Sequence, residues 1–175
     1  MSQWLASKWD YSIFRLIFLR GDIMSKKTIG IQEILSTLPH KPPILLVEKV
    51  IEFNDEFIRA EKNVSVNEPL VQGHFPGHPI FPGLWTVEGM AQTSALLYYL
   101  HNPSQVGQKL PILSGVSDSR FKGMVKPGDR IVYEVKIEKV KMGKYFLSGK
   151  AYVDDKLIAS AKFSGSFVNV DQVFG

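Results

Sequence analysis

Residues 83–100 (GLWTVEGMAQTSALLYYL) limit the possible folds of this chain most, because their spacing predicts a helix that is apolar almost all round. The apolar side chains recur at helical intervals, as one stripe and a second set that widens it: Leu84, Val87, Ala91, Ala95 and Tyr98, then Met90, Leu97 and Leu100. A helix with so little polar surface needs cover on every side. The remaining sequence must therefore supply a layer that wraps around it.

Segments with β-strand character lie on both sides of that helix and can form this layer. Along residues 130–140, apolar side chains such as Ile131 and Tyr133 alternate with mostly polar ones, as in an antiparallel sheet with one face on the core. We also expect a short helix in residues 28–38, which Pro39 ends. The pattern predicts an α+β fold, with a curved antiparallel sheet around one long central helix. The expected strands are 44–53, 57–66, 112–121, 130–140, 144–154 and 157–168.

The 175 residues, 45% of them hydrophobic, suffice for one compact domain with its own core. We assign that domain to residues 24–175. Residues 1–23 are expected to be an N-terminal extension ahead of the start-like sequence MSKK. The alternative is an amphipathic segment that packs on the domain or on a membrane surface. Arg15 and Arg20 interrupt its apolar run, so we expect no membrane span, which requires about 20 apolar residues.

Cysteine is absent from the chain, and the net charge is only +4. Without thiols there can be no disulfide, thiolate metal site or cysteine nucleophile, and this composition fits a cytoplasmic protein. The mild basic excess fits an acidic protein partner better than a nucleic acid. His74 and His78 have a metal-like spacing, but prolines break the loop between them, so we expect no metal site.

The candidate catalytic groups are two titratable side chains. One lies in a glycine- and proline-rich loop, and the other lies just after that loop. His74 lies in GHFPG, and Glu88 lies in the second turn of the apolar helix. Glu88 is either paired with a local partner or kept protonated by burial, in which case it can act as a general acid. His74 is either a hydrogen-bonded loop residue or a general base. The remaining histidines are interpreted as structural: His40, His78 and His101.

Gly83 follows Pro82 at the start of the helix, where backbone N–H groups lack acceptors within the helix. An N–H at this end of the helix dipole can polarise a carbonyl oxygen and stabilise an enolate. Spacing alone leaves open the alternative that Gly83 is an ordinary glycine at a helix entry.

Four successive motifs resemble those of the 3-hydroxyacyl-(acyl-carrier-protein) dehydratases of the FabZ type. They are LPHKPPILLVEKV, KNVSVNEPLVQGHFPGHPIFPG, VEGMAQ and RFKGMVKPGDRI, and the similarity covers roughly residues 28–168. The resemblance implies the hotdog fold of that family, with His74 and Glu88 as the catalytic pair. It also implies that the Gly83 N–H binds the thioester carbonyl and that Gln92 orients Glu88.

The resemblance further implies dehydration of a (3R)-hydroxyacyl thioester to the trans-2-enoyl thioester in fatty acid biosynthesis, without a cofactor. We expect neutral His74 to remove the C2 proton and protonated Glu88 to protonate the leaving hydroxyl. An apolar tunnel beside the helix would receive the acyl chain.

The resemblance also bears on the partners of the chain. The sites of this family lie between two subunits, which predicts a homodimer and, by further assembly, a hexamer. The substrate would arrive on an acidic acyl carrier protein, which a basic patch could bind, although a solvated basic loop is the alternative. The patch comprises Arg120, Lys122, Lys126 and Arg130.

Several positions depart from the pattern of the family without touching the proposed catalytic residues. They are the HKPP sequence in the first motif and Trp85, Thr86, Pro111, Ile112, Ser117 and Asp118. They leave open the acyl chain length and the contacts with the carrier. Two other functions also stay open: the chain could be a hotdog acyl thioesterase or a non-catalytic acyl-binding protein.

Overall fold

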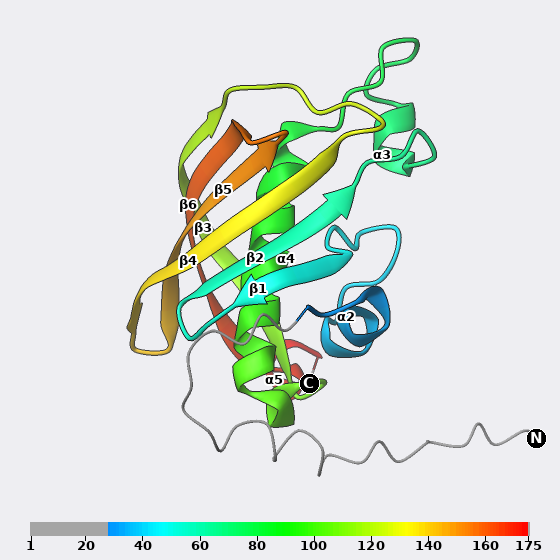
Figure 1. The fold of residues 1–175 in the computed structure, drawn as a ribbon. Helices are drawn as coiled ribbons and strands as arrows, with labels where there is room; N and C mark the ends of the chain where they lie inside the picture. Colours follow the sequence, from blue (N-terminus) through cyan, green and yellow to red (C-terminus); the bar gives the residue numbers. More distant parts are fainter. Residues whose placement is uncertain (1–27, 175) are drawn as a thin grey trace, which may run out of the picture.

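The computed structural model describes residues 28–174, which form one curved sheet and a long helix that it encloses (Figure 1). The elements are α2 (Ile31–Thr37), β1 (Lys49–Phe53), β2 (Phe57–Asn63), α3 (Pro69–Gln72), α4 (Gly83–His101), the 3₁₀ turn η1 (Pro103–Gln105), β3 (Lys109–Phe121), β4 (Arg130–Lys141), β5 (Lys144–Val153), β6 (Lys156–Asn169) and α5 (Val170–Phe174). Neighbouring strands are antiparallel, in the order β1-β2-β4-β5-β6-β3. The predicted α+β architecture is confirmed, whereas the predicted extension 1–23 lies outside the described residues.

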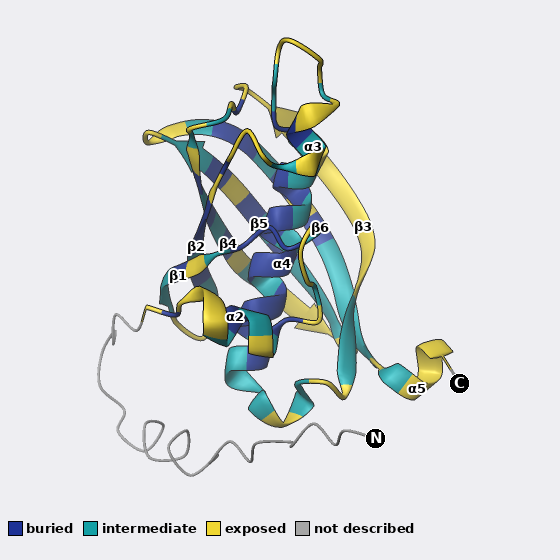
Figure 2. Cartoon of the chain, turned by 90° about the vertical axis from the view of Figure 1, so that its right-hand side faces the viewer, coloured by how far each residue is buried: buried dark blue, intermediate teal, exposed yellow. Residues whose placement is uncertain are grey.

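Helix α4 runs along the inner face of the sheet and forms the centre of the core (Figure 2). It packs against β2, β4, β5 and β6, and its residues Met90, Leu96 and Leu97 are fully buried. Leu84, expected on the buried stripe, is instead 75% exposed, because the first turn of α4 faces a surface hollow rather than the sheet. Within residues 28–174, no helix has the length and hydrophobicity needed to cross a membrane.

The first strand is shorter than the predicted 44–53, since β1 begins at Lys49. The residues before it lie against α4, where the Leu46 N–H donates to the side-chain oxygen of Gln92 (2.8 Å) rather than to a neighbouring strand. Leu46 and Val47 are fully buried, so this apolar run belongs to the core without being a strand. The short helices α3 and α5 were not predicted, although Pro69 at the first position of α3 is a favourable helix start.

Strand β3 forms one end of the sheet, and within the described residues its only partner is β6. Much of β3 is exposed (Figure 2). Its exposed residues include the apolar Ile112, Leu113 and Val116. Proteins usually cover or charge a strand edge that is both open and apolar, because such an edge can pair with another chain. This edge is therefore suited to contact with a second chain.

Gly89 allows the buried Tyr133 of β4 to approach helix α4 closely. A Cβ atom at residue 89 would lie 2.4 Å from the Tyr133 Cζ, far inside contact distance. We expect Gly89→Ala to lower the free energy of unfolding by about 2 kcal/mol, because the added methyl group forces a fully buried ring to shift within the core. Gly30→Ala is the control, since no atom lies within 4 Å of a Cβ there. Urea titration measures both, and equal midpoints would contradict the expectation.

Candidate active site

His74 lies in the loop between α3 and α4, which itself holds the imidazole. The His74 Nδ1 is 2.9 Å from the carbonyl oxygen of Ile80, and the Ile80 N–H donates to the His74 carbonyl oxygen (2.8 Å). A carbonyl oxygen can only accept, so Nδ1 carries the hydrogen and the lone pair of the neutral ring lies on Nε2. His74 is therefore oriented as a base whose accepting atom is Nε2.

The tip of this loop is a tight turn that carries His78 away from His74. Phe75 and His78 exchange backbone hydrogen bonds across the turn, at 2.9 and 3.1 Å. Gly77 has a φ of +78°, a left-handed conformation that glycine adopts at little cost. His78 is exposed and does not line the hollow that contains His74.

Gly83 begins α4 and lines the same hollow as His74, together with Leu84 and Phe121. Among the described residues, its backbone N–H has no hydrogen-bond acceptor. A Cβ at residue 83 would lie 2.9 Å from the Phe121 ring, so the aromatic side chain packs directly on the glycine. The hollow thus combines an oriented imidazole with a helix-terminal N–H, which is the equipment for binding a carbonyl beside a base.

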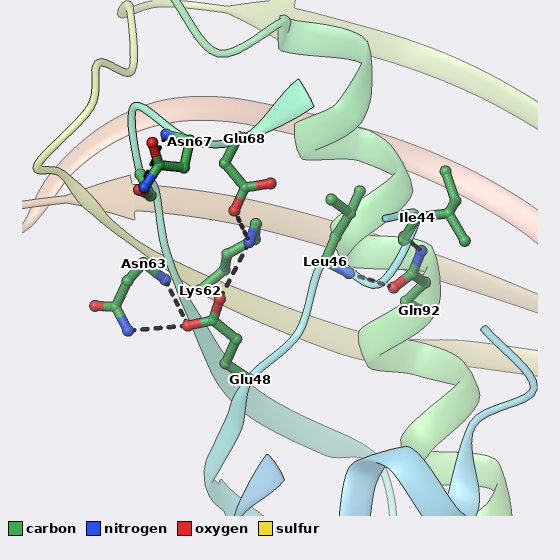
Figure 3. Close-up of polar contacts among 9 residues, drawn as sticks. Ile44, Leu46, Glu48, Lys62, Asn63, Asn67, Glu68 and Gln92 are labelled. Carbon is green, nitrogen blue, oxygen red and sulfur yellow. Dashed lines mark hydrogen bonds and ion pairs between the residues drawn. The ribbon is translucent and has the colours of Figure 1, made fainter. Parts of the chain in front are cut away.

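Glu88 lies one turn along α4 from Gln92, whose amide fixes the carboxylate. The Gln92 Nε2 donates to the Glu88 Oε1 (2.9 Å) and to the carbonyl oxygen of Ile44 (2.8 Å). The Gln92 Oε1 accepts from the Leu46 N–H, so both ends of the amide are occupied and its orientation is set (Figure 3). Gln92 is 1% exposed, while the Glu88 side chain is 30% exposed and faces a cavity.

His40 lies beside Glu88, which sequence analysis did not anticipate. The His40 Nε2 is 3.7 Å from the Glu88 Oε1. Burial lowers the pKa of His40 and Lys41 lowers it further, although the carboxylate of Glu88 acts in the opposite direction. The contact joins residues far apart in sequence, and the LPHK motif carries no local signal for it.

The cavity at Glu88 extends beside α4 and is mostly apolar beyond His40, Glu88 and Gln92. Its lining includes Pro111 and Ile112, two of the positions that depart from the pattern of the family. Farther along it, the rings of Tyr98 and Phe167 stack with their centroids 3.5 Å apart. Its other apolar lining residues are Ala91, Leu113, Ile137, Tyr145, Leu147 and Phe163. A cavity of this kind suits an alkyl chain better than a polar ligand.

Within one chain, His74 and Glu88 line different hollows. The hollow of His74 and Gly83 also includes Phe121, at the end of the open-edged β3. The cavity of Glu88 includes Ile112, on the same strand. The structure therefore does not bring the predicted acid and base together within a single subunit.

The four predicted carrier-binding side chains are all exposed: Arg120, Lys122, Lys126 and Arg130. Arg130 lies 3.6 Å from a carboxylate oxygen of Glu61. Lys122 lies between Phe121 and Gly123, both of which line the hollow of His74. At least part of the basic surface therefore borders that hollow.

Comparison with known proteins shows where this chain belongs. Residues 38–162 match the family model of the FabA-like domain. A curated relative from Fusobacterium nucleatum, named 3-hydroxyacyl-(acyl-carrier-protein) dehydratase FabZ, is 41% identical over 138 residues, covering 78% of this chain and 95% of its own. Relatives of the same name from Petrotoga mobilis and Cronobacter sakazakii are 44% and 46% identical, covering 77% of this chain and 94% and 89% of theirs. The chain belongs to the FabZ family. The resemblance inferred from its motifs is thereby confirmed.

Solved structures agree on the fold of this FabZ-family chain. The dehydratase heterocomplex ApeI:P from Xenorhabdus doucetiae matches with a TM-score of 0.71 at 18% identity, covering 81% of this chain and 94% of that one. A hot-dog-like protein from Thermanaerovibrio acidaminovorans matches with a TM-score of 0.54 at 17% identity, covering 67% and 84%. The predicted hotdog fold is confirmed.

Proposed function

We propose that this chain dehydrates (3R)-hydroxyacyl-acyl-carrier protein to the trans-2-enoyl form in cytoplasmic fatty acid biosynthesis. The observation that carries the proposal is the pair of fixed groups in a chain of the FabZ family. His74 presents the Nε2 of its ring, and Glu88 is held by the amide of Gln92. The names of the relatives supply the substrate class.

The reaction needs a base and an acid, because the Cα–H bond is weakly acidic and hydroxide is a poor leaving group. The Nε2 of His74 takes the C2 proton, and the electron pair moves into an enolate stabilised by the Gly83 N–H. The enolate then expels the C3 hydroxyl, which leaves as water with a proton from Glu88. The products are the enoyl thioester and one water molecule, and no redox change occurs.

The proposed active unit is a homodimer in which each site takes His74 from one subunit and Glu88 from the other. Two observations support it. The residues line separate hollows within one chain, and β3, which contributes to both hollows, has an open apolar edge. A two-fold axis through such an edge would produce two equivalent sites. Assembly of three dimers into a hexamer is the further expectation.

We also propose that the carrier protein docks beside the hollow of His74. Lys122 and Lys126 are exposed and lie in the segment that borders this hollow. The acidic carrier would be attracted to this surface, chiefly through a faster association rate that decreases as salt is added.

The test of the function is mass spectrometry of (3R)-hydroxyacyl-carrier protein incubated with the purified chain, over short and long acyl groups. We expect loss of one water from the acyl group, and rehydration when the enoyl product is supplied instead. Release of the free carrier thiol without dehydration would identify a thioesterase. An acyl-carrier protein that is bound but unchanged at every length would identify a non-catalytic binding protein.

A further inference from the structure

A buried lysine joins two segments on either side of the candidate site. The Lys62 side chain on β2 is 3% exposed, and its Nζ lies 2.6 Å from the Glu68 Oε1 and 3.1 Å from the Glu48 Oε1 (Figure 3). Lys62 follows Ile58 and Ala60 on the core-facing side of the strand, where a charged residue is unusual. An ammonium group in such a position must be paired, because an isolated buried charge is strongly unfavourable.

Strand β2 is a rigid base for this lysine. It pairs with β1 on one side and with β4 on the other, with Lys62 opposite Ile131. The two carboxylates that it binds belong to residues outside these strands, since Glu48 precedes β1 and Glu68 precedes α3. The Glu48 backbone is nevertheless joined to β2 by one hydrogen bond, from its N–H to the Glu61 carbonyl oxygen (2.9 Å). Lys62 therefore fixes the side chains of two flanking segments to one strand, and for the Glu48 segment it adds to the backbone bond.

The Glu68 side leads to His74. The carbonyl oxygen of Glu68 accepts from the N–H groups of Val71 and Gln72, at 3.0 and 3.3 Å, and so forms the start of α3. The His74 N–H in turn donates to the Val71 carbonyl oxygen (3.2 Å). The position of Glu68 thus determines where the short helix begins and where the His74 loop leaves it.

The Glu48 side leads to Glu88. Glu48 is held by Lys62 and also accepts from the backbone and side-chain N–H groups of Asn63, at 3.1 and 2.9 Å. Two residues earlier in the chain, the Leu46 N–H binds the amide of Gln92, which donates to Glu88. Loss of the Lys62 contact would therefore leave this segment held by the Asn63 bonds and by one backbone bond to Glu61, and so would loosen the segment that orients Gln92.

Tyr133 is a buried residue whose hydroxyl is influenced by the same carboxylates. Its hydroxyl is buried and has no hydrogen-bond partner among the described residues. Burial raises the pKa of this hydroxyl, and three carboxylates raise it further: Glu48, Glu68 and Glu88. The two ligands of Lys62 and the candidate acid therefore all influence one buried group.

We propose that Lys62 is a positioning residue that holds the His74 loop through Glu68 and the Gln92–Glu88 pair through Glu48. The inference rests on the proposed function. It predicts that Lys62→Met lowers kcat by about 10- to 100-fold, as displacement of catalytic groups by up to about 1 Å does, while KM changes by less than about threefold. Lys49→Met is the matched control, because Lys49 is a half-exposed lysine paired with Glu61 (3.5 Å) in the same sheet, and its removal should leave kcat unchanged.

Stability must be separated from positioning, because Lys62→Met leaves two carboxylates without their cation and is expected to lower the melting temperature. The double variant Lys62→Met/Glu68→Leu removes a cation and an anion together, while Glu48 keeps its hydrogen bonds from Asn63. We expect its melting temperature to recover and its kcat to stay low. Recovery of kcat along with the melting temperature would overturn the proposal and leave Lys62 a stabilising role only.

The decisive experiment places Glu68→Leu in one of two chains. In a mixture of His74→Ala and Glu88→Gln chains, native His74 is present only in the Glu88→Gln chain, and native Glu88 is present only in the His74→Ala chain. Every complete site therefore takes its His74 from the Glu88→Gln chain, whatever the size of the oligomer. Glu68→Leu in that chain should lower the recovered kcat by about tenfold, whereas Glu68→Leu in the His74→Ala chain should leave it unchanged.

Both mixtures contain the same substitutions, so a difference in kcat between them reports the connection from Lys62 through Glu68 to the His74 loop rather than general stability. Equal activity in the two mixtures would show that Lys62 does not position the His74 loop through Glu68, and would overturn the proposal. If the parent mixture without Glu68→Leu shows no dehydration at all, the shared site of the proposed function fails, and that result is distinct from equal activities.

Discussion

His74→Ala and Glu88→Gln are each expected to lower kcat for dehydration by about 10²- to 10⁴-fold, the range associated with general acid–base catalysis. Alanine removes the Nε2 lone pair that would take the C2 proton. Glutamine keeps the size of Glu88 and can still accept the hydrogen bond from Gln92, but it has no carboxyl proton to donate. Mass spectrometry of the acyl-carrier protein at saturating substrate measures both losses.

Two substitutions control for indirect effects on the same structure. His78→Ala removes an exposed imidazole from the same loop, and Glu56→Gln removes an exposed carboxylate from the turn between β1 and β2. Both should retain activity within about twofold, as surface substitutions away from a site usually do. If His74→Ala retained as much activity as His78→Ala, the base would have to be another residue.

Mixing His74→Ala chains with Glu88→Gln chains should restore about a quarter of the parental activity, although each variant alone is expected to have lost at least about 10²-fold in kcat. With random pairing, half of the dimers contain one chain of each kind, and one of the two sites in each such dimer has both native groups. The recovery follows from placing His74 and Glu88 of one site on different subunits. Co-expression with two affinity tags gives the mixture, and its turnover is compared with that of the parent.

A second mixture makes this result specific. Chains carrying both substitutions, mixed with His74→Ala chains, contain no native His74, so no recovery is expected. Absence of recovery in the first mixture, with mixed dimers demonstrated by tandem purification, would mean that each subunit carries a complete site. A conformational change would then be needed to bring the hollow of His74 and the cavity of Glu88 together within one chain.

The parts of the fold that sequence analysis predicted well are those with a strong local pattern. Helix α4 is predicted within one residue at its end, because its apolar residues repeat over several turns. Strand β4 is predicted because the buried Ile131, Tyr133 and Val135 alternate with more exposed residues. Residues 44–48 were misassigned because an apolar run looks the same in a strand and in a coil buried against a helix.

The candidate site was less predictable because it depends on contacts between distant segments. Two of these contacts join residues that precede the His74 loop in the sequence to residues that follow it. They are the contact of His40 with Glu88 and the hydrogen bond of the Leu46 N–H to Gln92. For Lys62 the sequence did contain a signal, since a period of two from Ile58 places a lysine on the core face. That position calls for a buried counter-ion, but the pattern cannot identify Glu48 and Glu68 as the partners.

The amide of Gln92 also makes the two carboxyl oxygens of Glu88 chemically different. The Oε1 accepts the Gln92 N–H and is the atom nearest to His40, whereas no group among the described residues donates to Oε2. An oxygen whose lone pair already accepts a hydrogen bond is the poorer place for a proton, so a proton on Glu88 resides on Oε2. The amide could reverse this preference only by flipping, which would turn its N–H groups toward the Leu46 N–H and its oxygen toward the Ile44 carbonyl. Rotation of the carboxyl group exchanges the two atoms but not the two positions, so each turnover would return the proton to the oxygen that lies away from Gln92.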